Sequence, residues 1–231
     1  MNMAAFKKLV SAAALTGLLA GLLLTAAQQI QVVPLILEAE MHEQAGETAS
    51  RTGQTNAAVA HEPGAWQPER GWERNLFAAG ANVVVAVGFA LLLGAAVALR
   101  GAKLDWRTGV LWGLGGYAVF FVAPSLGLPP ELPGAAAVGL VPRQLWWAAA
   151  SALTAAGLAC IVFPGRRAIK ILGVVLVIVP HLVGAPQANV HGGTAPAELA
   201  QAFIVATTIV NAVFWLVLGG LFGFFHRRLE D

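Results

Sequence analysis

The sequence predicts an all-α polytopic membrane protein, a transmembrane helical bundle of about six spans with both termini in the cytoplasm. Three observations lead to this fold class. The 231 residues are 58% hydrophobic and only 11% charged, whereas soluble domains carry about 25% charged residues. Long apolar segments recur along the chain, and basic residues gather in alternate connections between them. The whole chain, residues 1–231, is expected to form a single integral membrane domain whose solvent is the lipid bilayer.

Six segments are candidates for membrane-spanning helices, because a span needs about 20 mostly apolar residues. They cover residues 9–37, 77–99, 108–128, 145–163, 168–185 and 201–225. The first is long enough to tilt or to continue past the membrane surface. The fifth is the shortest and contains Pro180. An alternative for the N-terminus is a cleaved signal peptide over residues 1–27, which would leave five spans.

The basic residues predict the orientation of the spans. Ten of the 14 Lys and Arg residues precede the first segment or follow the second, fourth and sixth. These ten are Lys7, Lys8, Arg100, Lys103, Arg107, Arg166, Arg167, Lys170, Arg227 and Arg228. If all six segments cross the bilayer, these groups share one side. Connections rich in Lys and Arg stay in the cytoplasm, so both termini are predicted to be cytoplasmic.

The connection over residues 38–76 is predicted to be an extracytoplasmic loop with a flexible middle at 45–60, because that middle is rich in Gly, Thr, Gln and Ala. The predicted outer connections hold nine of the 12 acidic residues. An acidic surface concentrates cations, and imidazole with carboxylate suits Co²⁺, Ni²⁺ or Zn²⁺. If the first helix continues past Leu37, Glu38 and His42 lie on one face. The candidate outer metal ligands are Glu38, Glu40, His42 and His61, followed by His191 and Glu198.

The stretch VIVPHLVGAPQ, residues 177–187, interrupts the fifth segment with Pro180. Proline lacks the backbone N–H that would bond to the carbonyl of Leu176, and Gly184 and Pro186 disfavour further helix. The sequence therefore predicts a helix break at Pro180, roughly 20 Å from the cytoplasmic basic cluster at 1.5 Å per residue. An ionisable residue within a span suggests function, so His181 is a candidate metal ligand. The alternative is a passive, hydrogen-bonded histidine at a helix end.

Several function classes find no support in the sequence. The only cysteine is Cys160, so the chain can form neither an internal disulfide nor a Cys-rich metal cage. The chain has no GxxxxGK[ST], GxGxxG or HExxH pattern. No nucleophile stands beside an obvious base. We therefore expect no enzyme activity, no nucleic-acid partner and no permanently bound cofactor.

Five stretches together resemble the probable cobalt transporter subunit family CbtA. They read VVPLILEAE at 32–40, WRTGVLWGLGGYAVFFVAPSLGLPPELPG at 106–134, RQLWW at 143–147, PHLVGAPQ at 180–187 and PAELAQAFIVATTIVNAVFWLVLGG at 196–220. The resemblance implies a subunit of a Co²⁺ uptake transporter in the bacterial inner membrane, linked to cobalamin synthesis. It also implies a small single-span partner subunit with a His-rich tail, of the CbtB type. The family is expected to have about five spans.

Within this expectation, Glu38, Glu40 and His42 would collect Co²⁺ at the outer mouth with His61, and His181 would bind it on the way through. Two alternatives remain open. In a proton-coupled permease for a small solute, His181 would relay protons and Co²⁺ would not compete for transport. In a membrane scaffold without transport, His181→Ala would be silent. Association with a second copy of the chain is also left open.

Overall fold

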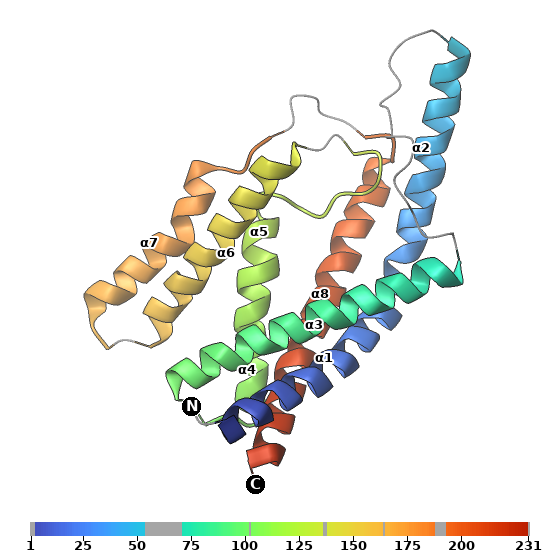
Figure 1. The fold of residues 1–231 in the computed structure, drawn as a ribbon. Coiled ribbons are helices and arrows are strands. Elements are labelled where there is room, and N and C mark those ends of the chain that lie inside the picture. Colours follow the sequence, from blue (N-terminus) through green and yellow to red (C-terminus); the bar gives the residue numbers. More distant parts are fainter. Residues whose placement is uncertain are drawn as a thin grey trace.

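The computed structural model describes residues 3–53, 71–101, 103–135, 138–163, 165–187 and 193–230. Within these ranges the elements are helices, apart from one isolated bridge between Ala135 and Gly193. The all-α prediction is confirmed. In chain order the helices are α1 (Met3–Gln31), α2 (Val33–Gly53), α3 (Trp72–Arg100), α4 (Trp106–Tyr117), the π-helix η1 (Ala118–Val122), α5 (Ala123–Ser125), α6 (Leu140–Val162), α7 (Arg167–Val183) and α8 (Ala197–Glu230) (Figure 1).

Five helical segments of the described chain are long and apolar enough to cross a membrane. They are α1, α3, the continuous run from α4 through α5, α6, and α8. The fifth predicted segment forms α7, which has 17 residues and is therefore about 25 Å long. That length falls short of the roughly 30 Å hydrocarbon core. The difference between five and six spans thus depends on one short apolar helix.

A bend at Val32 divides the first predicted segment into α1 and α2. Backbone hydrogen bonds continue through it, from Val32 N to Gln28 O (2.9 Å) and from Ile36 N to Val32 O (3.1 Å). Pro34 has no N–H for the carbonyl of Ile30, and such a gap bends a helix. Helix α2 leaves α1 at a steep angle and extends beyond the bundle (Figure 1). It continues to Gly53, so residues 45–53 of the segment predicted to be flexible are helical, while residues 54–60 lie outside the described residues.

The main helix pairs are α1 with α3, α1 with α8, and α4 with α8, and a separate pair joins α6 to α7. The α6–α7 pair meets the rest of the bundle through α6, which contacts η1 and α5. Glycines make the close approaches: a methyl group on Gly113 would overlap the carbonyl oxygen of Trp215, and one on Gly157 would lie 2.6 Å from the carbonyl oxygen of Gly173. These glycines thus mark helix contacts, as small residues do in membranes.

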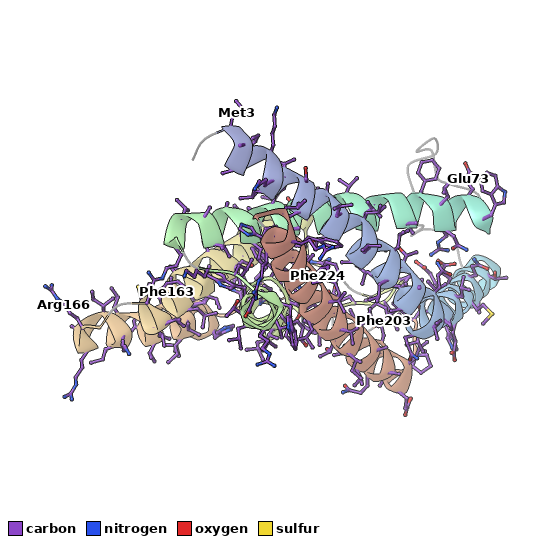
Figure 2. The ribbon with its side chains drawn as sticks, turned by 90° about the horizontal axis from the view of Figure 1, so that it is seen from below. Met3, Glu73, Phe163, Arg166, Phe203 and Phe224 are labelled. Atoms are coloured by element: carbon purple, nitrogen blue, oxygen red, sulfur yellow. The ribbon has the colours of Figure 1, made fainter. Side chains whose placement is uncertain are left out.

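All four basic groups lie at the same end of the molecule. A methyl group on Gly94, near the end of α3, would meet Leu9 of α1 and Phe222 of α8. The Arg100 guanidinium lies 4.7 Å from the ring centroid of Phe163, which joins α6 to α7. At the opposite end lies the start of α3; Figure 2 shows Glu73 and Arg166 at opposite ends of the molecule. The basic groups that alternate along the sequence therefore lie together at one end of the structure, as predicted.

Helix α7 continues through Pro180, so the prediction of a helix break at this residue is wrong. The helix ends three residues later, at Val183, and Gly184 follows with φ +83° and ψ 150°. The proline is the first residue of the last turn. It removes a single hydrogen bond, to the carbonyl of Leu176, and the turn that it begins remains helical. The amide of Gly184 donates to the carbonyl of Pro180 at 3.1 Å. Gly184 therefore ends the helix, because its backbone conformation is nearly exclusive to glycine.

A capping box starts α4 at the basic end. Asp105 Oδ1 accepts from the Thr108 amide at 2.8 Å, and Thr108 Oγ1 accepts from the Asp105 amide at 2.9 Å. The Thr108 backbone bond, followed by the Thr108 hydroxyl, lowers the pKa of Asp105 below its usual value of 3.8. Both bonds favour the ionised carboxylate. The cap satisfies amides that the first turn of a helix otherwise leaves without partners.

Candidate functional site

Two of the predicted outer ligands lie one helical turn apart on α2. The helix does continue past Leu37, as the pairing of Glu38 with His42 requires. Glu38 is exposed and His42 is half-buried. Residues four apart on a helix are neighbours, so a carboxylate and an imidazole from this face can bind the same ion. The remaining coordination positions of such an ion would be open to water or to other side chains.

Glu40, a third predicted ligand, is engaged in an ion pair. Arg74 Nη2 lies 2.9 Å from Glu40 Oε1, and the side chains are 36% and 20% exposed. The pair joins α2 to the first turn of α3. Arg143 and Glu131 form a second ion pair of 3.0 Å, between α6 and the loop that precedes it. Arg74 and Arg143 are two of the four basic residues outside the predicted cytoplasmic groups. Each is paired with a carboxylate, so neither adds a net positive charge to the predicted outer side.

His181 lies on α7, away from the α2 ligands. Its ring meets the Trp146 ring of α6 edge-on, with centroids 6.3 Å apart. Because α7 packs chiefly on α6, this site is on the opposite side of the molecule from α2 (Figure 1). Glu198 is exposed in the first turn of α8, and His61 and His191 lie outside the described residues. Among the residues that the structure describes, no three His, Cys, Asp or Glu side chains gather to hold a metal ion.

A row of amide and hydroxyl side chains lies between the halves of α1 and α3 that are farther from the basic end. We call it the polar seam, and it consists of Thr25, Gln28, Gln29, Asn75 and Asn82. Asn82 Nδ2 donates to Gln28 Oε1 at 2.7 Å and to Thr25 Oγ1 at 3.0 Å. Towards the surface, Gln29 Nε2 donates to Asn75 Oδ1 at 3.0 Å. The seam begins near the Glu40–Arg74 ion pair, since Arg74 is the neighbour of Asn75, and reaches into the apolar part of the bundle.

Helical spacing explains why these residues meet. Asn75 and Asn82 are two turns apart on α3, while Thr25 and Gln28 lie about one turn apart on α1. Asn82 is ten residues after the start of α3, about 15 Å along the helix. Asn82 thus donates across the α1–α3 interface. Asn211, by contrast, donates to Thr207 O of its own helix at 2.9 Å. The spacing of amides on the two helices is the signal that the sequence prediction did not use.

Between the polar seam and the basic end, the backbones of α1 and α3 are in contact. A methyl group on Gly21 would lie 2.6 Å from Val83 Cα, and one on Gly17 would lie 2.5 Å from Val87 Cα. This part of the interface has no room for additional side chains. The half of the α1–α3 interface farther from the basic end is therefore polar, and the half nearer to it is tightly packed.

The family comparison agrees with the resemblance inferred from the five sequence stretches. The family described as "Probable cobalt transporter subunit (CbtA)" matches residues 6–227, nearly the whole chain. No curated protein and no solved structure matches the chain. The match is consistent with Co²⁺ as the transported ion, and the word subunit implies a partner. With its apolar helices, the chain is a multi-pass membrane protein that belongs to the CbtA family of cobalt transporter subunits.

Proposed function

We propose that this chain is the membrane-spanning subunit of a Co²⁺ uptake transporter in the bacterial inner membrane, serving cobalamin synthesis with a small single-span, His-rich partner subunit. The family match over residues 6–227 carries this proposal. The basic end of the bundle faces the cytoplasm by the positive-inside rule. The acidic connections, with Glu38 and Glu198 exposed, then face the side from which Co²⁺ arrives.

Co²⁺ first binds at the face of α2 that carries Glu38 and His42. One carboxylate oxygen and one imidazole nitrogen suit a borderline divalent cation. Two protein ligands leave most of the hydration shell in place, so the ion is held weakly enough to move on. His61 is a further candidate ligand from the same outer connection. The Glu40–Arg74 ion pair fixes α2 against α3 and so positions this face.

From α2 the ion moves along the polar seam. The oxygens of Gln28, Thr25 and Asn82 form a neutral group with N···O distances of 2.7 and 3.0 Å. Neutral oxygens can replace water molecules around a cation without holding it permanently. The inward potential supplies about 4.6 kcal/mol per 100 mV for a doubly charged ion. The packed glycines below the seam must separate for the ion to pass. His181 remains a second candidate ligand, at a separate position on α7.

Uptake of radioactive cobalt by cells that express the chain with its partner tests this path. Asn82→Leu is expected to lower uptake at least tenfold, because it removes the amide that holds the seam together. Asn211→Leu is the matched control, since this amide binds only its own helix. Interhelical hydrogen bonds in membranes contribute about 0.6 kcal/mol, so both variants should remain folded. Equal uptake by the two variants at equal expression would remove the seam from the path.

The proposed ligands are tested separately. Replacing Glu38 and His42 together with alanine is expected to raise the Co²⁺ concentration for half-maximal uptake several-fold and to leave the maximal rate nearly unchanged. His181→Ala examines the second position. If only His181→Ala lowers uptake, the ion passes beside α7 and α6 instead. If the wild-type chain gives no uptake that depends on Co²⁺, the proposed function itself is wrong.

A further inference from the structure

A wedge-shaped pocket of about 1110 Å³ opens between α3 and α6 at the basic end of the bundle. Its floor is formed by α4 and η1, with Trp215 of α8. The pocket exists because α6 reaches the rest of the bundle through η1 and α5 and has no extensive contact with α3. The path described above runs through the outer half of the α1–α3 interface, so this pocket plays no part in it.

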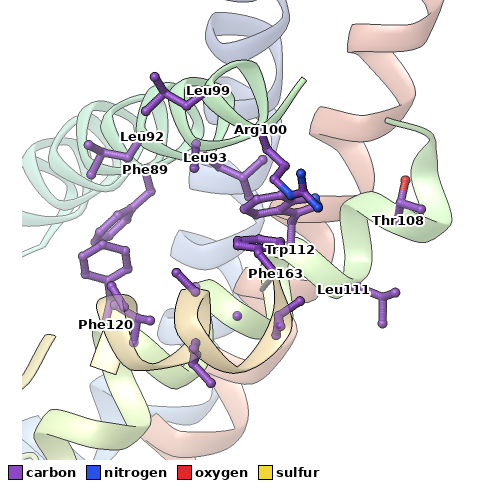
Figure 3. A pocket seen from close by; sticks show the side chains of 18 of the residues that line it. Phe89, Leu92, Leu93, Leu99, Arg100, Thr108, Leu111, Trp112, Phe120 and Phe163 are labelled. Atoms are coloured by element: carbon purple, nitrogen blue, oxygen red, sulfur yellow. The ribbon is translucent and has the colours of Figure 1, made fainter. Parts of the chain in front are cut away.

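The lining of the pocket is apolar along its length and charged at one end. Phe89 and Phe120 lie together at the deep end, with ring centroids 5.1 Å apart. At the shallow end the Arg100 guanidinium lies over Phe163, and the Phe163 ring centroid is 5.9 Å from that of Trp112 (Figure 3). Among the described residues that line the pocket, Arg100 is the only charged one. The pocket therefore suits an elongated apolar ligand with a polar or anionic end.

Positive charge at the shallow end is not balanced by carboxylates. Arg100 and Lys103 form no ion pair with an Asp or Glu among the described residues, and the Arg107 guanidinium lies 5.3 Å from the centroid of the Trp106 ring. The nearby carboxylate of Asp105 is occupied by the capping box of α4. A guanidinium on an aromatic face keeps its N–H donors available, and guanidinium pairs well with phosphate.

The depth of the pocket corresponds to one leaflet. From Arg100 back to Phe89 the wall of α3 covers 11 residues, about 16 Å. Half of the hydrocarbon core is about 15 Å thick. An acyl chain anchored at the cytoplasmic surface would fill this depth. A complete transmembrane helix of a partner would need a groove through both leaflets, and the pocket does not continue along the outer half of α3.

We infer that this pocket binds an anionic phospholipid of the cytoplasmic leaflet, with an acyl chain along α3, α4 and α6 and its phosphate at Arg100, supported by Lys103 and Arg107. Basic pockets between membrane helices on this side are suited to anionic lipid headgroups. The bound lipid fills the wedge between the α6–α7 pair and the rest of the bundle. Lipid binding is independent of transport, so this inference stands or falls separately from the proposed function.

Native mass spectrometry of the purified full chain, exchanged into dioleoylphosphatidylglycerol or dioleoylphosphatidylcholine, tests the inference. The wild type is expected to retain one phosphatidylglycerol and to prefer it about fivefold over phosphatidylcholine, as one basic residue near a headgroup can provide. Arg100→Gln is expected to abolish this preference. Arg228→Gln removes a charge at the same end outside the pocket and should leave the preference unchanged.

A second pair of variants tests the apolar part. A Cβ at Gly115, which lines the pocket, would meet nothing within 4 Å, so Gly115→Leu places additional side-chain atoms in the space proposed for the acyl chain. Gly88→Leu adds the same side chain where a Cβ also meets nothing, outside the pocket. Gly115→Leu should lose both lipids, whereas Gly88→Leu should retain phosphatidylglycerol. Equal retention of both lipids by the wild type, or unchanged retention by Gly115→Leu, overturns the inference. So would cross-links from Gly115→Cys that reach only the partner subunit.

Discussion

Gly109 of α4 and Gly219 of α8 meet backbone to backbone, so closely that a methyl group on either would overlap the carbonyl oxygen of the other. Gly113 and Gly223 continue the contact one turn away on each helix, against Trp215 and Asp105 respectively. Such proximity brings Cα–H groups and carbonyls together and increases dispersion contacts. The α4–α8 interface therefore depends on hydrogen atoms at these positions.

Gly219→Leu is expected to destabilise the protein by about 3 kcal/mol or more, at the upper end of overpacking effects, because backbone on both sides must move. Unfolding in detergent, followed by circular dichroism, measures the change. Gly80→Leu is the control, since a Cβ there meets nothing within 4 Å. Similar unfolding curves for the two variants would show that α4 and α8 are not in contact through these glycines.

The Glu40–Arg74 ion pair is expected to contribute up to about 1 kcal/mol, since both side chains are partly exposed and such pairs contribute 0.2–1 kcal/mol. A double-mutant cycle with Glu40→Gln and Arg74→Gln isolates the coupling. The coupling should fall between 50 mM and 500 mM salt, because ions screen exposed charges. A coupling that is zero at low salt would mean that the ion pair does not hold α2 against α3.

The two unusual residues near the end of α7 should respond differently to substitution. Gly184→Ala is expected to cost about 1–3 kcal/mol, because φ +83° with ψ 150° is strained for any residue with a Cβ. Pro180→Ala should leave stability unchanged or raise it, since the helix already runs through this position and alanine can donate to Leu176. Thermal unfolding of both variants measures the difference. The opposite order would mean that the proline, and not the glycine, determines where α7 ends.

Acid should remove the contribution that the ionised carboxylate in the capping box makes to the stability of the protein. Hydrogen bonds from Thr108 hold the pKa of Asp105 below its usual value of 3.8. A depressed folded-state pKa gives stability that is fully present above the unfolded pKa and is lost as pH falls through the folded one. Asparagine also caps helices but does not titrate. The thermal midpoints of wild type and Asp105→Asn should therefore converge as the pH falls from 5 to 2. A constant difference between the midpoints would exclude this linkage.

Hydropathy identified the long apolar helices, because twenty apolar residues in a row have few alternatives to a span, but it did not predict the polar part of α2 beyond residue 37. It placed every predicted start after the true one, and α8 extends to Glu230 beyond the predicted 225, because a helix continues in water without apolar side chains. The break at Pro180 was misplaced because a missing N–H near a helix end removes only one bond, whereas the backbone conformation of Gly184, with φ +83°, is not helical and ends the helix. The sequence thus predicted correctly that the helix ends in this stretch, but placed its end at Pro180 and not at Gly184.

The candidate site was less predictable, because it depends on which helices touch. The pairing of Glu40 with Arg74 and of Asn82 with Gln28 joins residues 34 and 54 positions apart. Composition alone identified an acidic outer surface and the Glu38–His42 spacing, both of which are local. It did not identify the partner helix of Asn82, which follows from the glycines at positions 17 and 21 packing α1 on α3. Sequence signals within one helix were therefore informative, and contacts between helices required the structure.

The pairing of α7 almost entirely with α6 has a consequence for biosynthesis. A helix of 17 residues with Arg167 and Lys170 in its first turn is a weak substrate for membrane insertion by itself. Its Gly173 packs against Gly157 of the helix made just before it. We therefore expect the two to enter the bilayer together as a helical hairpin, before α8 has been synthesised. The last helix then completes a bundle whose α1, α3 and α4 partners are already in place.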